Sequence, residues 1–187
     1  MARLIMWNLM TLDGMVEGPN RDISWHGDVW GKELEQLSIE QLNAAGGLMF
    51  GRVTYELMAN YWPTASEPGE IADFMNAMPK YVFSRTLTRS NWNNTQMFGA
   101  DVPGTVARLK RESQKDIFLF GSADLSASLI QHGLIDEFRI GIAPVTLGGG
   151  TPLFKPGERI KLRLIDSRAH STGVVILRYE PAGGLRA

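Results

Sequence analysis

The chain has no cysteine, almost no net charge and no long hydrophobic run. Because none of its 187 residues is cysteine, it can form neither disulfides nor cysteine metal sites, and thiol catalysis is excluded. A formal net charge of −1 gives no reason to expect nucleic acid or an anionic membrane as a partner. No stretch approaches the roughly 20 apolar residues that a membrane helix needs. We therefore expect a soluble, cytoplasmic protein.

The composition is that of one globular domain. Hydrophobic residues make up 44% and charged residues 21% of the chain, which is ordinary for a soluble protein. A chain of this length forms a substantial core. No repeat, low-complexity tract or linker divides it, so we expect residues 1–187 to form a single domain.

Short apolar segments alternate with segments of helical periodicity, which predicts an α/β layer structure with a largely parallel sheet. Gly46-Gly47 is expected to stop the first long helix, and the last two strands have no helix between them, so the sheet should end antiparallel. The predicted strands are 3–9, 48–50, 81–83, 117–120, 138–143, 161–165 and 174–179, and the predicted helices are 30–45, 52–59, 71–78, 104–112 and 125–130.

The segment from Asp116 onward carries the strongest functional signal. An apolar strand reaches Gly121-Ser122 and a helix follows, so the free N–H groups of a helix N-terminus should meet the end of a buried strand. Such a terminus attracts phosphate or another anion. Gly121 lets the backbone approach a ligand closely, and Ser122 is a good N-cap. This arrangement suggests a nucleotide site without establishing one.

Three of the predicted strands end in small, hydroxyl-bearing or cationic residues. Ligands of open parallel sheets bind beyond the carboxyl ends of the strands, so these turns could converge on one ligand with several phosphates. The alternative is that the arginines are solvated surface charges and the glycines only turn the chain. The residues concerned are Gly51, Arg52, Thr54, Ser84, Arg85, Thr86, Gly121, Ser122 and Ala123.

With these residues located, the chain resembles the dihydrofolate reductase-like superfamily. It is most similar there to the reductase domain of the bifunctional deaminase-reductase of riboflavin biosynthesis and to its stand-alone bacterial relatives. The stretches that carry the resemblance run in order along nearly the whole chain. They are LMTLDGMVEG, LMFGRVTYELMANYWP, KYVFSRTL, FLFGSADLSASLIQHGLIDEFRIGIAPVTLGGGTPLF and GVVILRYE.

The resemblance implies a three-layer α/β/α sandwich around a mostly parallel sheet with antiparallel C-terminal strands, binding NADPH across the strand ends. Carried over by residue, Gly51, Arg52 and Thr54 would lie along the cofactor phosphates. The Ser84-Arg85-Thr86 turn would surround the adenosine 2′-phosphate, and Gly121-Ser122-Ala123 would hold the pyrophosphate. A homodimer through strands near the C-terminus is also implied.

The catalytic acid is harder to select. Dihydrofolate reductases hold their heterocycle with an acid on the first helix, and Asp28, Glu33 and Glu35 lie in that region here. The deaminase-reductase domain has a turn similar to the one that carries Asp13, beside the nicotinamide. Asp13 could equally bond its own turn. Asp13, Asp28 and Glu33 are the predicted catalytic residues.

Two tryptophans and one histidine complete the predicted site. Trp25 and Trp62 could stack on a planar substrate ring, or simply pack in the core. His26 could relay a proton, although a lone loop histidine is more often solvated. The acidic pair Asp136-Glu137 resembles the family's fixed pair, and we expect it to bond turn amides. The three histidines show no metal-ligand spacing, so we expect no metal.

The function expected from these residues and the resemblance is an NADPH-dependent reductase of a planar nitrogen heterocycle, with a small-molecule substrate as its partner. The nearest named activity is 5-amino-6-(5-phosphoribosylamino)uracil reduction. The alternatives are dihydrofolate reductase-type activity and a non-catalytic NADPH-binding or sensor protein on the same scaffold.

Overall fold

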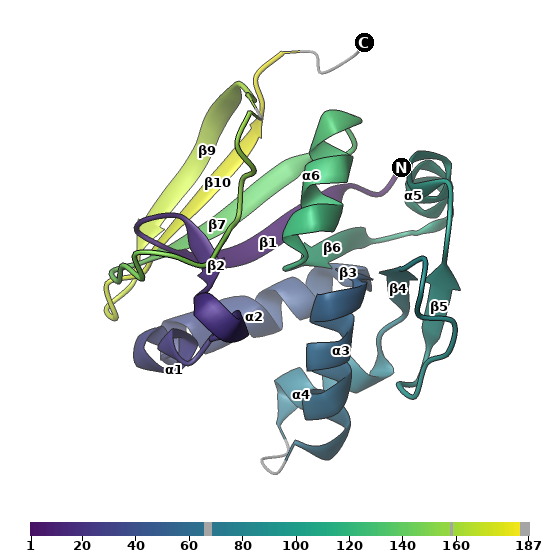
Figure 1. Cartoon of the computed structure of the whole chain (residues 1–187), viewed down its shortest axis with the longest axis horizontal. Helices are drawn as coiled ribbons and strands as arrows, with labels where there is room; N and C mark the ends of the chain where they lie inside the picture. The colour runs from purple at the N-terminus through teal and green to yellow at the C-terminus, as the bar shows by residue number, and fades with distance from the viewer. Residues whose placement is uncertain (66–68, 158, 184–187) are drawn as a thin grey trace.

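The computed structural model describes residues 1–65, 69–157 and 159–183. An eight-stranded sheet forms its centre, with the strand order β5-β4-β3-β6-β1-β7-β10-β9 (Figure 1). The neighbours from β5 to β7 are parallel, whereas β10 is antiparallel to both β7 and β9. The mostly parallel sheet with antiparallel C-terminal strands is as predicted. The strands are β1 Leu4–Thr11, β3 Ala45–Gly51, β4 Lys80–Phe83, β5 Thr95–Phe98, β6 Asp116–Phe120, β7 Glu137–Ala143, β9 Leu162–Ala169 and β10 Val175–Pro181.

Helices cover both faces of this sheet and make the three layers (Figure 1). Four helices pack against one hydrophobic core and two against the other. The first group is α1 Trp25–Val29, α2 Lys32–Ala44, α3 Arg52–Tyr61 and α4 Glu70–Ala77, and the second is α5 Val102–Glu112 and α6 Ala123–Gln131. Short 3-10 turns lie at Pro19–Arg21 (η1) and Trp62–Thr64 (η2).

The central strand β1 shows why the sequences of the strands are continuous apolar runs. Ile5 and Trp7 face the core under α1–α4, and Leu4 and Met6 face the core under α5 and α6. Successive side chains of a strand point to opposite faces, so a strand covered on both faces must be apolar at nearly every position. The one polar interruption of this run before the strand end is Asn8.

The prediction that Gly46-Gly47 stops the preceding helix and precedes the strand is wrong in detail. Helix α2 ends at Ala44, and both glycines belong to β3. A Cβ at Gly46 would lie 2.6 Å from Ser113 Oγ, and one at Gly47 would lie 2.6 Å from Tyr81 Cε2. The glycines therefore allow close packing of the strand against its neighbours, and a helix leads into it directly.

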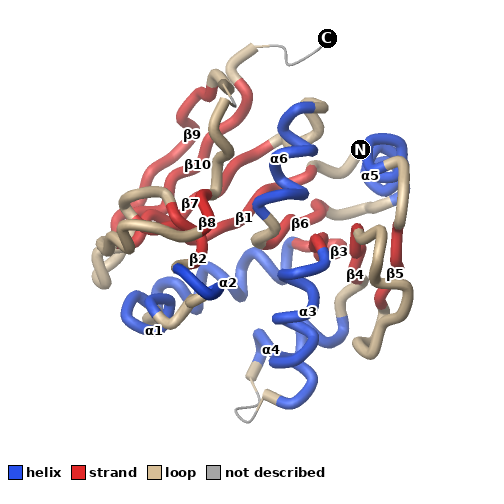
Figure 2. The backbone as a smooth tube through the Cα atoms, in the orientation of Figure 1, coloured by secondary structure: helices blue, strands red, loops and turns tan. Residues whose placement is uncertain are grey.

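Three strands were not predicted. Edge strand β5 is only four residues long, and its sequence Thr-Gln-Met-Phe shows no two-residue alternation. The other two, β2 Met15–Glu17 and β8 Thr151–Pro152, form a separate two-stranded sheet beside the end of β1 (Figure 2). Such short pairings are set by the meeting of distant loops, which leaves little local pattern. Among the described residues, no helix is long and apolar enough to cross a membrane.

Candidate functional site

A cleft of about 1080 Å³ opens where the parallel strands end. Residues from all three predicted turns line it, because β4, β3 and β6 are adjacent in the sheet and their carboxyl ends share one edge. The predicted convergence of these turns is therefore present. We call the lining residues from these turns the edge cluster: Arg52, Thr54, Ser84, Arg85, Thr86, Gly121, Ser122 and Ala123.

The turn after β6 is held in an unusual backbone conformation. Gly121 has φ +55°, and a Cβ there would lie 2.9 Å from Thr54 Oγ1, so only glycine fits. Ser122 follows with φ +63°. Its Oγ accepts a hydrogen bond from the Gly51 N–H (2.7 Å) and donates one to Thr54 Oγ1 (2.9 Å). The turn after β6 is thus tied directly to the start of α3, and Gly51 acts through this bond without lining the cleft.

The prediction that Ser122 caps α6 through its side chain is wrong. Ser122 occupies the N-cap position, but its side chain makes no capping hydrogen bond, because the hydroxyl is engaged with Gly51 and Thr54. The first N–H groups of α6 are consequently left without a serine partner at the cleft. This leaves the helix N-terminus able to receive an anion.

The two arginines of the edge cluster differ in their partners. Arg52 pairs with Glu56 one helical turn later, at 2.8 Å. Arg85 is exposed and makes no ion pair with any described residue. Ser84 Oγ accepts from Thr86 N (3.2 Å) and shapes the turn that carries Arg85. Of the two cations, Arg85 is the one whose charge is not already offset.

The candidate acid Asp13 does not line the cleft. It accepts from Thr11 Oγ1 at 2.5 Å and from the backbone N–H groups of Leu147 (3.1 Å) and Gly148 (2.8 Å). The Thr11 bond, followed by the Gly148 bond, lowers the pKa of Asp13 below its ordinary value. These contacts match the turn-bonding alternative, extended to a second loop.

The other two candidate acids are also outside the cleft. Asp28 is exposed, and Glu33 accepts from the backbone N–H (2.6 Å) and the hydroxyl of Ser171, which lowers the pKa of Glu33. The face of α2 that borders the cleft carries Ser38 and Gln41 instead. Helical periodicity turns Glu33 away from this face. Neither acid is brought to the predicted site.

The two predicted tryptophans lie in different places. Trp25 is 3% exposed and lies in the core, as in the packing alternative. Trp62 lines the cleft, and so does Trp30, which sequence reasoning did not select. His26 also lines it; its Nε2 is buried without a hydrogen-bond partner, and burial lowers the pKa of the imidazole. His26 is therefore predominantly neutral near pH 7.

Two further polar residues of the cleft were missed. Asn8 is 4% exposed and Gln41 is 3% exposed, and the side-chain nitrogen of each is buried without a partner. Buried polar groups are normally hydrogen-bonded. A polar residue inside an apolar run, such as Asn8 in β1, is the signal that could have identified one of them.

A second group of cleft residues comes from α1, α2, α3 and the segments that join them. Apolar and aromatic groups dominate it, with a few uncharged polar groups. We call it the helical wall: His26, Trp30, Ser38, Gln41, Met58 and Trp62. Two carboxylates line the described part of the cleft elsewhere: Glu17 accepts from Thr151 Oγ1 (2.7 Å), and Asp124 pairs with Lys155.

The loop over the cleft contains backbone strain. Asn20 and Arg21 line the cleft with φ of +59° and +63°, a conformation that non-glycine residues rarely adopt. Two such residues in succession are maintained by the surrounding fold and tend to occur at ligand sites. Arg21 also adds a cation to the cleft that sequence reasoning did not identify. Within the described residues, no cluster of three or more acidic or histidine side chains is placed to hold a metal.

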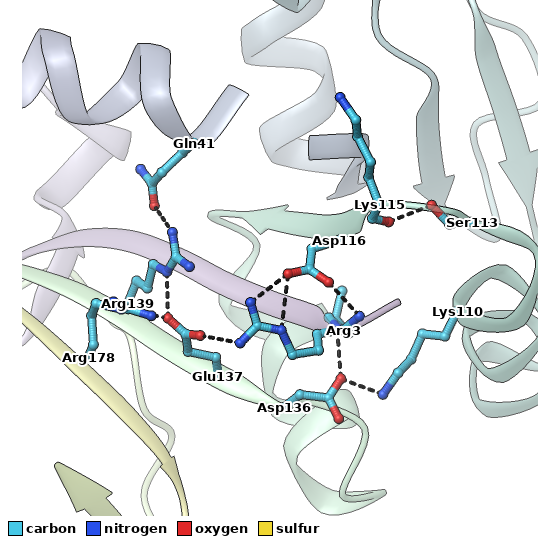
Figure 3. A network of polar contacts seen from close by, with 11 residues as sticks. Arg3, Gln41, Lys110, Ser113, Lys115, Asp116, Asp136, Glu137, Arg139 and Arg178 are labelled. Carbon is cyan, nitrogen blue, oxygen red and sulfur yellow. Dashed lines mark hydrogen bonds and ion pairs between the residues drawn. The ribbon is translucent and has the colours of Figure 1, made fainter. Parts of the chain in front are cut away.

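An ionic network centred on Glu137 lies at the amino ends of β1 and β7 (Figure 3). Glu137 is 1% exposed and accepts from Arg3 (2.9 Å), Arg139 (2.6 Å) and Arg178 (2.8 Å). Burial acts to raise the pKa of Glu137, but the hydrogen bonds from Arg178 and Arg139 outweigh it, so the pKa lies below its ordinary value. The expected bonding to turn amides is not what the structure shows: Asp136 accepts from Leu4 N (2.7 Å) at the start of β1 and pairs with Lys110, and Glu137 bonds guanidinium groups.

The whole chain can be compared with known proteins. The chain is 34% identical over 181 residues to the uncharacterized protein YyaP of Bacillus subtilis, covering 95% of this chain and 94% of that one. A putative riboflavin biosynthesis protein of Shewanella sp. PV-4 superposes with a TM-score of 0.79 at 19% identity, over 98% of this chain and 100% of the other.

A third similarity is to a two-function protein. The diaminohydroxyphosphoribosylaminopyrimidine deaminase/5-amino-6-(5-phosphoribosylamino)uracil reductase of Thermotoga maritima superposes with a TM-score of 0.70 at 13% identity. The match covers 97% of this chain and 57% of that protein, so this chain spans little more than half of it.

A family model tests the resemblance directly. The model described as the RibD C-terminal domain matches residues 2–176. This match confirms the resemblance found from the sequence motifs, and the superpositions confirm the dihydrofolate reductase-like sandwich. The chain belongs to the RibD C-terminal domain family.

Proposed function

We propose that this protein is an NADPH-dependent reductase that transfers hydride to a planar nitrogen heterocycle. The family supports an oxidoreductase of the reductase type, and the cofactor and substrate are the parts proposed here. The nearest named activity is 5-amino-6-(5-phosphoribosylamino)uracil reduction, which the name of the Thermotoga relative includes.

The observation that carries the proposal is the edge cluster. Three turns that are distant in sequence present hydroxyls, the α6 N-terminus and two arginines to one cleft. These groups suit a ligand with several phosphates. Arg85, which has no ion-pair partner among the described residues, is the residue we assign to the 2′-phosphate that distinguishes NADPH from NADH.

The turn after β6 fits a dinucleotide on its own geometry. Gly121 brings backbone to within contact of Thr54, and a side chain there would fill the space beside α3. Asn8 lines the same cleft, and its Nδ2 is buried without a partner. NADPH, when bound, supplies the hydride.

The helical wall carries the residues that we assign to the substrate ring. Trp30 and Trp62 offer flat surfaces for a planar ring. Neutral His26 also lines this wall, and its Nε2 is buried without a partner. The residues of this chain thus orient the substrate ring and exclude water.

The first experiment is a titration with NADPH and NADH, followed by tryptophan fluorescence and checked by calorimetry. Arg85→Ala should weaken NADPH binding by about tenfold or more and NADH binding by much less, because the lost partner is a phosphate. Arg89→Ala is the matched control, since Arg89 is exposed in the same loop and does not line the cleft. Equal weakening of both nucleotides by Arg85→Ala would contradict the assignment.

Turnover separates the reductase from a sensor protein. NADPH oxidation at 340 nm should depend on a heterocyclic substrate, with 5-amino-6-(5-phosphoribosylamino)uracil tested first and dihydrofolate second. Tight NADPH binding without turnover of any pyrimidine, pterin or quinone would favour the sensor alternative.

We propose in addition that the protein is a homodimer that uses the outer edge of the sheet. Strand β9 is an edge strand that is exposed along nearly its whole length, and Leu164 and Ile165 are 49% and 41% exposed. Exposed edges of this kind are normally protected or paired. Sedimentation that shows a monomer at micromolar concentration would refute this proposal.

A further inference from the structure

A second cavity, of about 190 Å³, lies between α2 and the antiparallel end of the sheet. Side chains from α2, β7, β9 and β10 line it, and among the described residues it shares only Gln41 with the main cleft. Three of its lining residues are arginines: Arg139, Arg168 and Arg178. None of them belongs to the edge cluster or to the helical wall, so their grouping here needs its own explanation.

Two of these arginines are direct neighbours across the sheet. Arg139 on β7 lies opposite Arg178 on β10, a position in which like charges repel each other. Glu137 offsets the repulsion, because its Oε1 accepts from the Nε of both residues, at 2.6 and 2.8 Å (Figure 3). Its other oxygen bonds Arg3. One carboxylate is therefore shared by three guanidinium groups, and the charge of the Arg139–Arg178 pair is only partly balanced.

Most of the terminal nitrogens of this pair are unused. Arg139 Nη1 donates to Gln41 (3.3 Å), and no other Nη of Arg139 or Arg178 bonds a described residue. The two side chains are 15% and 34% exposed, and none of their nitrogens is both buried and unpartnered. The free Nη groups are therefore open to solvent, where a ligand can reach them. Guanidinium edges of this kind bind carboxylate and phosphate oxygens.

Two residues on the β9 side extend the set of donors. Arg168 is exposed and lines the cavity, and it forms no ion pair with a described residue. His170, just after β9, also lines the cavity and is 7% exposed. Its Nδ1 is buried without a partner, whereas its Nε2 is open to solvent. A guanidinium and an imidazole can both donate to an anion in this space.

The remaining charges and the size of the cavity limit the ligand. Glu40 and Asp166 line the cavity as well, but both are exposed and neither pairs with a described cation. The three lining arginines therefore outnumber the lining carboxylates. Since a water molecule takes up about 30 Å³ in the liquid, a cavity of about 190 Å³ has room for a small ion with a few waters.

We propose that this cavity is a binding site for a small oxyanion, a phosphate, sulfate or carboxylate group, held by the open guanidinium edges of Arg139, Arg168 and Arg178. The site lies outside the main cleft, so the inference goes beyond the proposed function and does not rest on it. A bound anion would lie beside α2, because Arg139 also bonds Gln41 on that helix.

The test is a titration of isotope-labelled protein with sodium phosphate, sodium sulfate or sodium acetate at constant ionic strength, followed by two-dimensional NMR. The backbone N–H signals of Arg168, His170 and Arg178 should shift and saturate, with a dissociation constant of about 1 mM for the best anion. The salt that binds most tightly identifies the preferred group. Shifts that fail to saturate with all three salts would overturn the inference.

Variants on β9 sharpen the result. Arg168→Gln should weaken anion binding by about tenfold, the scale of one charge-assisted hydrogen bond. Asp166→Asn should strengthen it by about threefold, because it removes a charge of the same sign as the ligand. Arg111→Gln is the control, since Arg111 is exposed on α5 and does not line the cavity. Unchanged affinity in folded Arg168→Gln protein would also overturn the inference.

Phosphate is expected at the edge cluster too, so the experiment must separate the two sites. The shifts at the second cavity should persist in Arg85→Ala protein, because Arg85 lines only the main cleft. If they disappear in that variant, the anion binds in the cleft and the inference is overturned. Failure of the protein to bind NADPH, in contrast, would remove the proposed cofactor and leave the oxyanion site standing.

Discussion

The edge cluster and the helical wall line one cleft but are built in different ways. The edge cluster consists of short continuous segments, each placed by the strand that precedes it, and much of it is backbone. The helical wall consists of single side chains from α1, α2, α3 and η2, spread from His26 to Trp62. A site made of turns is encoded locally, whereas a site made of opposed helix faces depends on packing.

The supports of the two sides differ as well. Ser122 ties the turn after β6 to the junction of β3 and α3 through hydrogen bonds to Gly51 (2.7 Å) and Thr54 (2.9 Å). The helical wall is backed by the Glu137 network, which reaches Gln41 through Arg139 (Figure 3). A substitution in one support should therefore leave the residues of the other side in place. The following substitutions test that independence.

The largest effect is expected at Glu137. Glu137→Gln should lower the free energy of unfolding by about 3 kcal/mol, because it removes the buried counter-charge that Arg3, Arg139 and Arg178 share. Urea unfolding measures the loss, and Glu112→Gln is the control, since Glu112 forms an exposed pair worth less than about 1 kcal/mol. Folded variant protein should still bind NADPH, because Glu137 does not line the cleft. Equal losses in the two variants would contradict the role of the network.

From the pKa of Glu137 we also expect the protein to lose stability in acid. The pKa of Glu137 is lower in the folded protein than in the unfolded chain, so its contribution is fully present above the unfolded value of about 4.3. It is lost as the pH falls from there through the folded value, because the folded state must then take up a proton that it disfavours. Unfolding by urea between pH 6 and pH 3 should show this slope, and Glu137→Gln should reduce it.

On the other side of the cleft, Gly121→Ala should weaken NADPH binding by about tenfold. Alanine is strained at φ +55°, and its Cβ would meet Thr54 at 2.9 Å. Gly148→Ala is the matched control, because Gly148 has φ +69° but open space around its Cβ position. Both variants should lose about 1 kcal/mol of stability, and only Gly121→Ala should lose cofactor affinity. Similar NADPH affinities would show that the close approach has no role in binding.

The smallest effects are expected at the acids that lie outside the cleft. Asp28→Asn and Glu33→Gln should change steady-state kcat/KM by less than about twofold, as surface substitutions usually do. Steady-state kinetics with NADPH and the first substrate that turns over provide the measurement. A drop of a hundredfold in either variant would restore that acid to the catalytic site.

Where sequence reasoning succeeded, the information was local. The strand-turn-helix at Gly121 was located because an apolar run, a turn residue and a helical pattern follow one another directly, and the turn at Arg85 because polar residues directly follow an apolar run. Where it failed, a partner from elsewhere decided the outcome. The Ser122 hydroxyl bonds Gly51 and Thr54 rather than its own helix, although serine at an N-cap is locally favoured.

The helical wall shows most clearly what the local sequence does not reveal. Nothing near Glu33 or Gln41 indicates which of them faces the cleft, since both lie on a polar stretch of the same helix. The rotation of α2 on the sheet makes that choice, and it buries Leu34 and Leu42 while bringing Gln41 to Arg139. Because of this rotation, α2 brings the amide of Gln41 to the cleft rather than the carboxylate of Glu33.

The sequence by itself determined the layer architecture, the family and the turns of the edge cluster, because periodicity and turn chemistry act over a few residues. Only the tertiary structure decided that Asp13, Asp28 and Glu33 lie outside the cleft and that Asn8, His26 and Gln41 lie in it. The orientation of a helix is set by the apolar surface it buries against distant strands, and its polar residues follow that rotation.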